Sequence, residues 1–204
     1  MAIHFSPEEF VKTVRYLYVL SIRYNVICHL SPNEQENLYN QIAIKISNKE
    51  FQRASHVKNS SEFQRLYPND ASFFNAFEFH RMPSRQTAKK IRFLLSEMEA
   101  HLGFNSCDFN KTTLEHICPY NPEQQWVDSF GEGVNDVKDR LGNMLLLDKD
   151  ELKRSSFKEK TAAYSKVEYK LAQKVSEYGE WNIESVNEQQ KWMAGVAVKT
   201  WRVE

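Results

Sequence analysis

"TTLEHICPYNP", residues 112–122, is unlike the sequence before it. Its threonines and branched apolar residues indicate a strand, and the prolines at its end stop that strand. A second segment of this kind is "NMLLL", residues 143–147, whose unbroken apolar run predicts a short strand buried on both faces. These two segments decide the fold class, because helical periodicity fills most of the remaining chain.

Helix signals surround the two strands. "SPEE" (6–9) and "SPNE" (31–34) each place serine at the N-cap, proline first in the helix and glutamate third, which is the capping-box arrangement. Helices are predicted over residues 7–28, from residue 32 onward, and over 60–68, 70–80, 84–102, 135–142, 148–164 and 182–201. A restart at Ser156 is an alternative for the 148–164 helix. Residues 119–133 are expected to be irregular. The expected fold is mainly α, with an α-helical front half, a small ββα unit and a closing C-terminal helix.

The sequence contains no repeat, no low-complexity stretch and no linker long enough to divide it. We therefore predict a single domain over residues 1–204. Within it, residues 1–110 form a helical subregion, residues 111–165 a strand–strand–helix motif, and residues 166–204 the C-terminal helices.

Composition is ordinary for a soluble globular protein, with 41% hydrophobic and 26% charged residues. Basic and acidic residues number 27 each, so binding to nucleic acid would depend on a local basic patch. Three cysteines without a C-x-x-C pair fit a reducing cytoplasm and provide no structural zinc site. There is no signal-peptide layout and no apolar run of about 18 residues, which predicts a cytoplasmic protein without a membrane span.

An acid and a histidine, Glu115 and His116, stand side by side at the end of the first strand. Alone, such a pair is usually an ordinary strand end, and Asn143 alone is usually a turn or cap residue. Their layout of strand, irregular loop, strand and helix resembles the ββα-metal finger of HNH nucleases. That resemblance implies a histidine that activates water for attack on phosphorus. It also implies a divalent cation, held by the acid and by a residue of the following helix.

Longer motifs narrow the resemblance to one family. "LEHICPYNP", "RLGNMLLL", "FKEK" and "GEW…QKWMAGVAVKTW" are similar to elements of the C-terminal domain of GmrSD-type Type IV restriction endonucleases. The family order is E-H-I-x-P-Q-N-P, L-G-N-L-x-L-L, F-x-x-K and a final helix ending in Trp. The resemblance implies a DNA endonuclease or nickase of a restriction or defence system that works with a nucleotide-hydrolysing (NTPase) sensor domain. Because the chain has no Gly-rich phosphate-binding loop, we expect that sensor elsewhere in a longer protein or on a separate partner.

The resemblance assigns roles residue by residue. His116 takes the role of general base, Glu115 that of the metal-binding acid, and Asn143 that of the asparagine that braces the loop and orients the histidine. The family commonly has a second Asn, sometimes His, nine positions later as a metal ligand. This chain has Leu152 there, which has no ligand atom.

Three acidic residues could supply the missing oxygen: Asp148, Asp150 and Glu151, of which Glu151 is the nearest in sequence. With one of them, the site is expected to hold a single Mg²⁺ or Mn²⁺ ion. Without one, cation binding would be weak or lost. That outcome favours the alternative function, a catalytically decayed module that binds DNA or docks on the sensor subunit. A third hypothesis makes residues 1–110 an oligomerisation scaffold.

A basic run follows the second strand and comprises Lys149, Lys153, Arg154, Lys158 and Lys160. We predict that these residues contact the DNA backbone, since each such contact releases counterions and makes binding sensitive to salt. The alternative is a solvated face, because acidic residues interleave with them.

Overall fold

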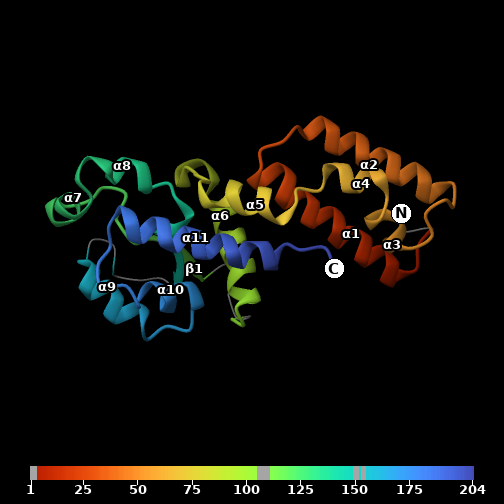
Figure 1. Ribbon diagram of the computed structural model, residues 1–204. Helices are drawn as coiled ribbons and strands as arrows, with labels where there is room; N and C mark the ends of the chain where they lie inside the picture. The colour runs from red at the N-terminus through yellow and green to blue at the C-terminus, as the bar shows by residue number, and fades with distance from the viewer. Residues whose placement is uncertain (1–3, 105–110, 149–151, 153–154) are drawn as a thin grey trace. The chain divides into compact units, whose positions relative to one another are not determined.

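The computed structural model describes residues 4–104, 111–148, 152 and 155–204. In this part the chain is mainly helical with a two-stranded antiparallel sheet, which confirms the predicted fold class at that level (Figure 1). The chain divides into two compact units, one formed by Met1–Ala76 with Trp201–Glu204 and the other by Phe77–Thr200. That residues 1–204 behave as a single domain stays a prediction. None of the helices in the described ranges is long and apolar enough to cross a membrane.

The first unit is helical. Its elements are α1 (Pro7–Ser21), the π-helical η1 (Ile22–Ile27), α2 (Pro32–Ser47), α3 (Ala54–Lys58), α4 (Ser61–Leu66) and most of α5 (Asp70–Glu78). The predicted helix over residues 7–28 is continuous, but its last part widens: the Cys28 N–H bonds to the Arg23 carbonyl five residues back, at 3.0 Å. Helix α3 was not predicted, because five residues are too few for a periodic signal.

The two predicted capping boxes of this unit are only partly present. Ser6 caps α1 by accepting the N–H of Glu9 at 3.4 Å, but the Glu9 carboxylate accepts the first N–H of α3 at 2.6 Å. Ser31 makes no side-chain cap bond, and Glu34 accepts a hydrogen bond from Tyr24 at 3.1 Å. Tertiary partners therefore draw both glutamates away from the role that the local pattern predicts.

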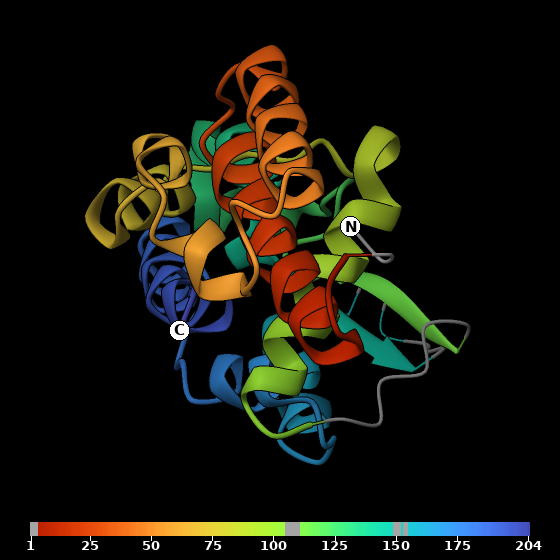
Figure 2. The same cartoon turned by 90° about the vertical axis from the view of Figure 1, so that its right-hand side faces the viewer.

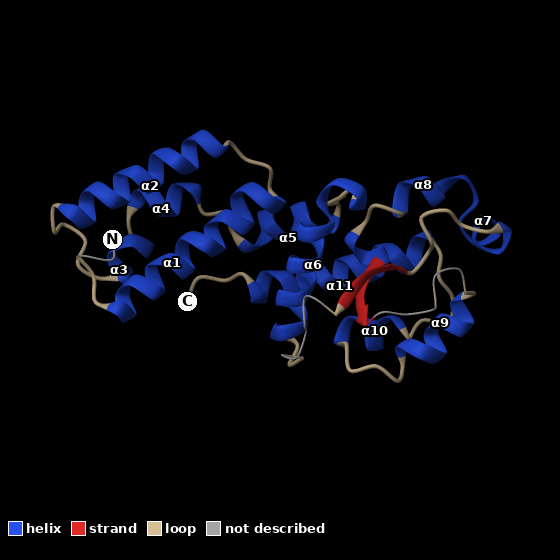
Figure 3. Ribbon diagram, turned by 180° about the vertical axis from the view of Figure 1, so that it is seen from behind, coloured by secondary structure: helices blue, strands red, loops and turns tan. Residues whose placement is uncertain are grey.

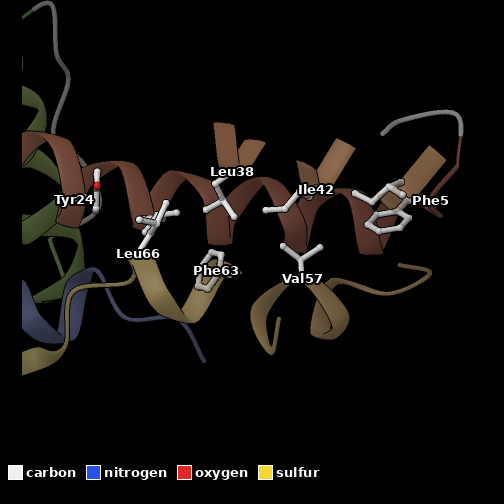
Figure 4. Packing of buried hydrophobic residues seen from close by; sticks show 9 residues of the cluster. Phe5, Tyr24, Leu38, Ile42, Val57, Phe63 and Leu66 are labelled. Atoms are coloured by element: carbon white, nitrogen blue, oxygen red, sulfur yellow. The ribbon is translucent and has the colours of Figure 1, made fainter. Parts of the chain in front are cut away.

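Apolar side chains from α1, η1, α2, α3 and α4 form the core of the first unit. Figure 4 shows Leu38 and Ile42 of α2 near Val57 of α3, Phe63 and Leu66 of α4. All five are at most 5% exposed. Burying each such side chain contributes about 1.5–3 kcal/mol, so this cluster is the main source of stability of the unit.

The second unit carries the strands. Its elements are α6 (Ser84–His101), β1 (Thr112–His116), α7 (Gln124–Phe130), η2 (Gly131–Gly133), α8 (Val134–Val137), η3 (Leu141–Asn143), β2 (Met144–Asp148), α9 (Phe157–Tyr164), α10 (Lys170–Val175) and α11 (Ile183–Thr200). The two long helices α6 and α11 match their predictions within two residues. Helix α7 lies where irregular chain was expected, and the helix expected over residues 135–142 is replaced by the shorter α8 and by η3.

Helix α9 begins at Phe157, which agrees with the alternative of a restart at Ser156 within the predicted 148–164 helix. Ser156 and Glu159 form a complete capping box: Ser156 accepts the N–H of Glu159 at 3.4 Å, and the Glu159 carboxylate accepts the N–H of Ser156 at 2.8 Å. Asp148 belongs to β2. The strand and the cap together set the start of the helix.

Strands β1 and β2 pair antiparallel, with Thr112 opposite Asp148 and His116 opposite Met144 (Figures 2 and 3). Helices α6 and α10 pack on β2. Residues 144–147 are at most 3% exposed, which confirms the prediction of a strand buried on both faces. The pairing brings the end of β1 to the start of β2, and the candidate site is built there.

Candidate active site

Asn143 braces the turn that follows β1. Its Oδ1 accepts hydrogen bonds from the Cys118 N–H at 2.8 Å and from the indole Nε1 of Trp181 at 3.1 Å. Its Nδ2 donates to the Cys118 carbonyl at 3.0 Å, and its own carbonyl accepts the Ile117 N–H at 3.0 Å. The Asn143 side chain is fully buried. These four bonds fix the chain immediately after His116 against the start of β2.

Gly142 explains why this turn packs so closely. Its N–H donates to Oε1 of Gln190 on α11 at 2.9 Å. A Cβ at position 142 would lie 2.7 Å from the Val186 carbonyl oxygen and 2.9 Å from the backbone nitrogen of Gln190. Only glycine lets η3 approach the backbone of α11 this closely. The "GN" pair thus joins α11 to the end of β1.

Glu115 is held by two residues of α9. Lys160 donates from Nζ to Oε1 of Glu115 and, at 2.9 Å, to the His116 carbonyl. Tyr164, one turn further along, donates its hydroxyl to the same Oε1 at 3.3 Å. Lys160 is fully buried and Glu115 is 7% exposed. A buried carboxylate needs such a partner, because an unpaired charge in this environment costs several kcal/mol.

The imidazole of His116 is partly buried beside this ion pair. Burial lowers the pKa of His116 to about 4, while the Asp139 carboxylate raises it and the Lys160 ammonium lowers it. The ring meets Tyr120 edge-on, with 6.0 Å between ring centroids. Within the described part of the chain, Nε2 is buried without a hydrogen-bond partner. At neutral pH the imidazole is therefore neutral, with hydrogen on one ring nitrogen and a lone pair on the other.

Cys118 lies two residues beyond His116 and is fully buried. Burial raises the pKa of its thiol to about 12, so the thiol stays protonated at neutral pH. A nucleophilic role, which requires the thiolate, does not fit this environment. The residue is a small packed side chain under the turn.

A divalent cation at Glu115 does not fit the described residues as they are arranged. The Lys160 ammonium occupies the position next to the carboxylate that a cation would need. In the ranges that the structure describes, no group of three or more His, Cys, Asp or Glu side chains is placed to hold a metal ion.

Of the residues that bear on the missing ligand, the structure describes Leu152 and Asp148. Leu152 is half-buried and apolar. Asp148 pairs with Thr112 at the opposite end of the strands, four residues or about 13 Å from the His116 end. Its Oδ1 accepts the Tyr169 hydroxyl at 2.9 Å. Asp148 is thus excluded as a ligand shared with Glu115. Residues 150 and 151 lie outside the described residues.

The two described lysines of the predicted basic patch, Lys158 and Lys160, have different environments. Lys158, in the first turn of α9, is exposed. Lys160 turns inward to Glu115, so it does not present its charge to solvent as a contact with DNA would require. Lys149, Lys153 and Arg154 lie outside the described residues.

An open cavity of about 260 Å³ lies beside Lys158. It is lined by residues of α7, the start of α9 and the chain before α11, including Trp126, Ser156 and Glu180. Lys158 is the exposed basic residue of this lining. The cavity offers room for a polar group next to the amino end of α9.

The comparison with known families agrees with this geometry. The model of the family described as GmrSD restriction endonucleases, C-terminal domain, matches residues 67–196. The chain belongs to this family. The matched region of the GmrSD C-terminal domain contains both strands, η3 and α9, and family membership indicates a restriction-type nuclease function. No curated protein matches the chain.

Three residues of the site were not predicted from the sequence: Asp139, Tyr164 and Trp181. Tyr164 had a signal, since Lys160 and Tyr164 are four residues apart and share one face of α9. Trp181 belongs to the "GEW" element of the family resemblance, which assigned it no role, and Asp139 had no signal, because tertiary packing alone brings it to the His116 turn.

Proposed function

We propose that this chain is a DNA endonuclease or nickase of a restriction or defence system, with His116 as the general base for phosphodiester hydrolysis. Membership in the GmrSD family supports the reaction class. The observation that carries the choice of His116 is the bracing of the turn after it, where Asn143 bonds both backbone groups of Cys118. A general base must be held in position relative to the water it deprotonates, and this bracing provides that hold.

The proposed steps are a proton transfer and a displacement. The imidazole of His116 takes a proton from water, the oxygen attacks phosphorus, and the bond from phosphorus to the leaving oxygen breaks as that oxygen takes a proton from a second water. The protonated imidazole then returns its proton to solvent. With a pKa of about 4, His116 is a weaker base than an ordinary histidine. An incoming phosphate adds negative charge nearby, which raises the basicity of the imidazole in the complex with substrate.

The cofactor implied by the family resemblance is one Mg²⁺ or Mn²⁺ ion, and it remains part of the proposal as a requirement to be tested. When bound, such an ion supplies positive charge to the phosphate. The described residues around Glu115 do not fit the ion, because Lys160 occupies that side of the carboxylate. The proposed steps therefore involve only His116, water and the phosphate.

Contact with the DNA backbone is proposed for Lys158, together with Lys149, Lys153 and Arg154. Lys158 is exposed at the amino end of α9, where the helix dipole also favours an anion. If one phosphate contact is lost in Lys158→Ala, the slope of log K against log salt falls by about 1. Lys166→Ala, an exposed lysine just beyond the end of α9, is the matched control and should leave the slope unchanged.

The decisive experiment is cleavage of supercoiled plasmid with Mg²⁺, with Mn²⁺ and with chelator. Nicked and linear products distinguish a nickase from an endonuclease. His116→Ala should lose cleavage, while His101→Ala, an exposed histidine at the end of α6, should retain it. Cleavage by His116→Ala at the wild-type rate would show that His116 is not the base.

The ion pair between Glu115 and Lys160, together with Leu152, favours a second candidate function. In it, the same fold has lost its cation site and serves to bind DNA or to dock on an NTPase sensor subunit. Calorimetric titration with Mn²⁺ distinguishes the two, using wild type and Glu115→Gln. Heat that disappears in Glu115→Gln supports the nuclease, and equal traces from both proteins support the docking module. A cytoplasmic location stays a prediction from the cysteine content.

A further inference from the structure

Two buried polar atoms without a hydrogen-bond partner among the described residues belong to charge-coupled side chains at the site. One is Nε2 of His116 and the other is Oδ1 of Asp139. The Asp139 carboxylate is the stronger of the two charges that act on the imidazole. Nearly all buried polar groups in proteins are hydrogen-bonded, so two unsatisfied atoms of complementary type point to a partner relation between them.

Backbone bonds hold Asp139 close to the histidine in the fold. The Asp139 carbonyl accepts the Met82 N–H at 2.8 Å. The next residue, Arg140, precedes the 3₁₀ turn η3, and the Arg140 carbonyl accepts the Asn143 N–H at 3.0 Å. The side chain of Asn143 in turn accepts the Cys118 N–H in the turn after His116. The segment from Asp139 to Asn143 therefore forms a fixed wall beside the end of β1.

Nearby cations are engaged elsewhere. Lys138 bonds Asn135 at 2.8 Å and lies over the Tyr120 ring. The Arg140 guanidinium donates to the Glu78 carbonyl at 2.7 Å and to Oε1 of Gln190 at 3.1 Å. Among the described residues, neither sequence neighbour pairs with the Asp139 carboxylate, and the imidazole of His116 is a complementary group on which its charge acts.

We propose that Asp139 is a positioning residue for His116: its carboxylate accepts the hydrogen of Nε2–H through one ordered water. A neutral imidazole has only one N–H, so holding that proton on Nε2 leaves the lone pair on Nδ1. Nδ1 is then the atom that receives the proton from water. The catalytic consequence rests on the proposed nuclease function, but the tautomer does not.

The first test is the tautomer of His116 in the full-length protein, read from the nitrogen-15 shifts of the ring at neutral pH. In the wild type, Nε2 should be the pyrrole-type nitrogen that carries hydrogen and Nδ1 the pyridine-type nitrogen. Asp139→Ala should give a mixture of tautomers, and Asp139→Asn, which keeps an oxygen acceptor, should restore most of the wild-type pattern. Asp136→Ala, an exposed acid three residues earlier, is the control and should change nothing.

A wild-type spectrum with hydrogen on Nδ1 overturns the proposal, whether or not the variants fold. A spectrum of Asp139→Ala that equals the wild type overturns it as well.

The second test separates this proposal from the proposed function. In plasmid cleavage, Asp139→Ala should lower kcat by roughly tenfold or more with little change in KM, within the ~10²–10⁴-fold that a general base contributes. A change in KM with kcat unaltered contradicts a positioning role. If no variant of His116 affects cleavage while the tautomer is as expected, the nuclease assignment of His116 fails and the Asp139–His116 pair stands.

Discussion

The buried ion pair between Lys160 and Glu115 allows a quantitative prediction for Lys160→Met. Methionine fills a similar volume but removes the ammonium, which leaves the Glu115 carboxylate buried without the charge that compensates it. Breaking a buried pair by removing one partner costs about 3–5 kcal/mol, because the remaining charge is uncompensated. For a chain of this size, that loss lowers the melting temperature by roughly 6–20 °C.

Urea unfolding followed by tryptophan fluorescence measures the loss. Lys174→Met is the matched control, since its ammonium pairs with Glu177 at the surface, where side-chain exposures are 31% and 64%. Such a pair contributes about 0–1 kcal/mol. The double variant Glu115→Gln with Lys160→Met removes both charges and should recover at least about 2 kcal/mol of the single loss.

Two results would refute this reasoning. One is a cost for Lys160→Met that is no greater than the cost for Lys174→Met. The other is a double variant whose loss equals the sum of the two single losses, because additivity means that the two residues do not interact.

Three further predictions concern the same unit. Gly142→Ala should cost about 2 kcal/mol or more in urea unfolding, because its Cβ would meet backbone atoms of α11 at 2.7–2.9 Å, whereas Gly195→Ala, with nothing within 4 Å, should stabilise α11 by up to about 1 kcal/mol. Asn143→Ala removes three side-chain hydrogen bonds in a fully buried site and should cost about 3 kcal/mol or more; a cost below 1 kcal/mol would contradict the bracing role. Burial raises the pKa of Glu99 to about 7, so its contribution to stability is complete below pH 4.5 and is lost as pH rises to 7, by on the order of 3 kcal/mol. Unfolding at pH 5 and pH 8 should therefore show wild type losing stability relative to Glu99→Gln, and a constant difference would refute this.

The parts of the fold that the sequence predicts are those with local signals. The strand at residues 144–147 follows from an unbroken apolar run, and α6 and α11 from long periodic faces; Asn182 caps α11 as predicted, accepting the Ser185 N–H at 3.0 Å. Helix α10 was missed because six residues show too little periodicity. The capping boxes predicted at residues 6–9 and 31–34 are not complete, because a carboxylate at the third helical position can bond elsewhere in the fold.

The residues of the candidate site also divide into those with a signal in the sequence and those without one. The motif resemblance located His116 and Asn143, and the strand pairing brings their segments together. Asp139 carries no local pattern that distinguishes it from the other acidic residues in the sequence. Its relation to His116 depends on η3 and on the contact of η3 with α11, which only the folded chain supplies.

Lys160 lies on the helix where the sequence predicted it, but its side chain points to Glu115 and not to solvent. The basic run after the second strand predicted that Lys160 contacts the DNA backbone, with a solvated face as the alternative. Yet Phe157, Lys160 and Tyr164 share one face of α9, and an amphipathic stem allows lysine to lie on such a face when its ammonium finds a carboxylate. Glu115 is that carboxylate. The positive charge that the resemblance assigns to a cation beside Glu115 is thus supplied in this fold by Lys160, and a cation can bind Glu115 only in competition with an ammonium that is already buried there.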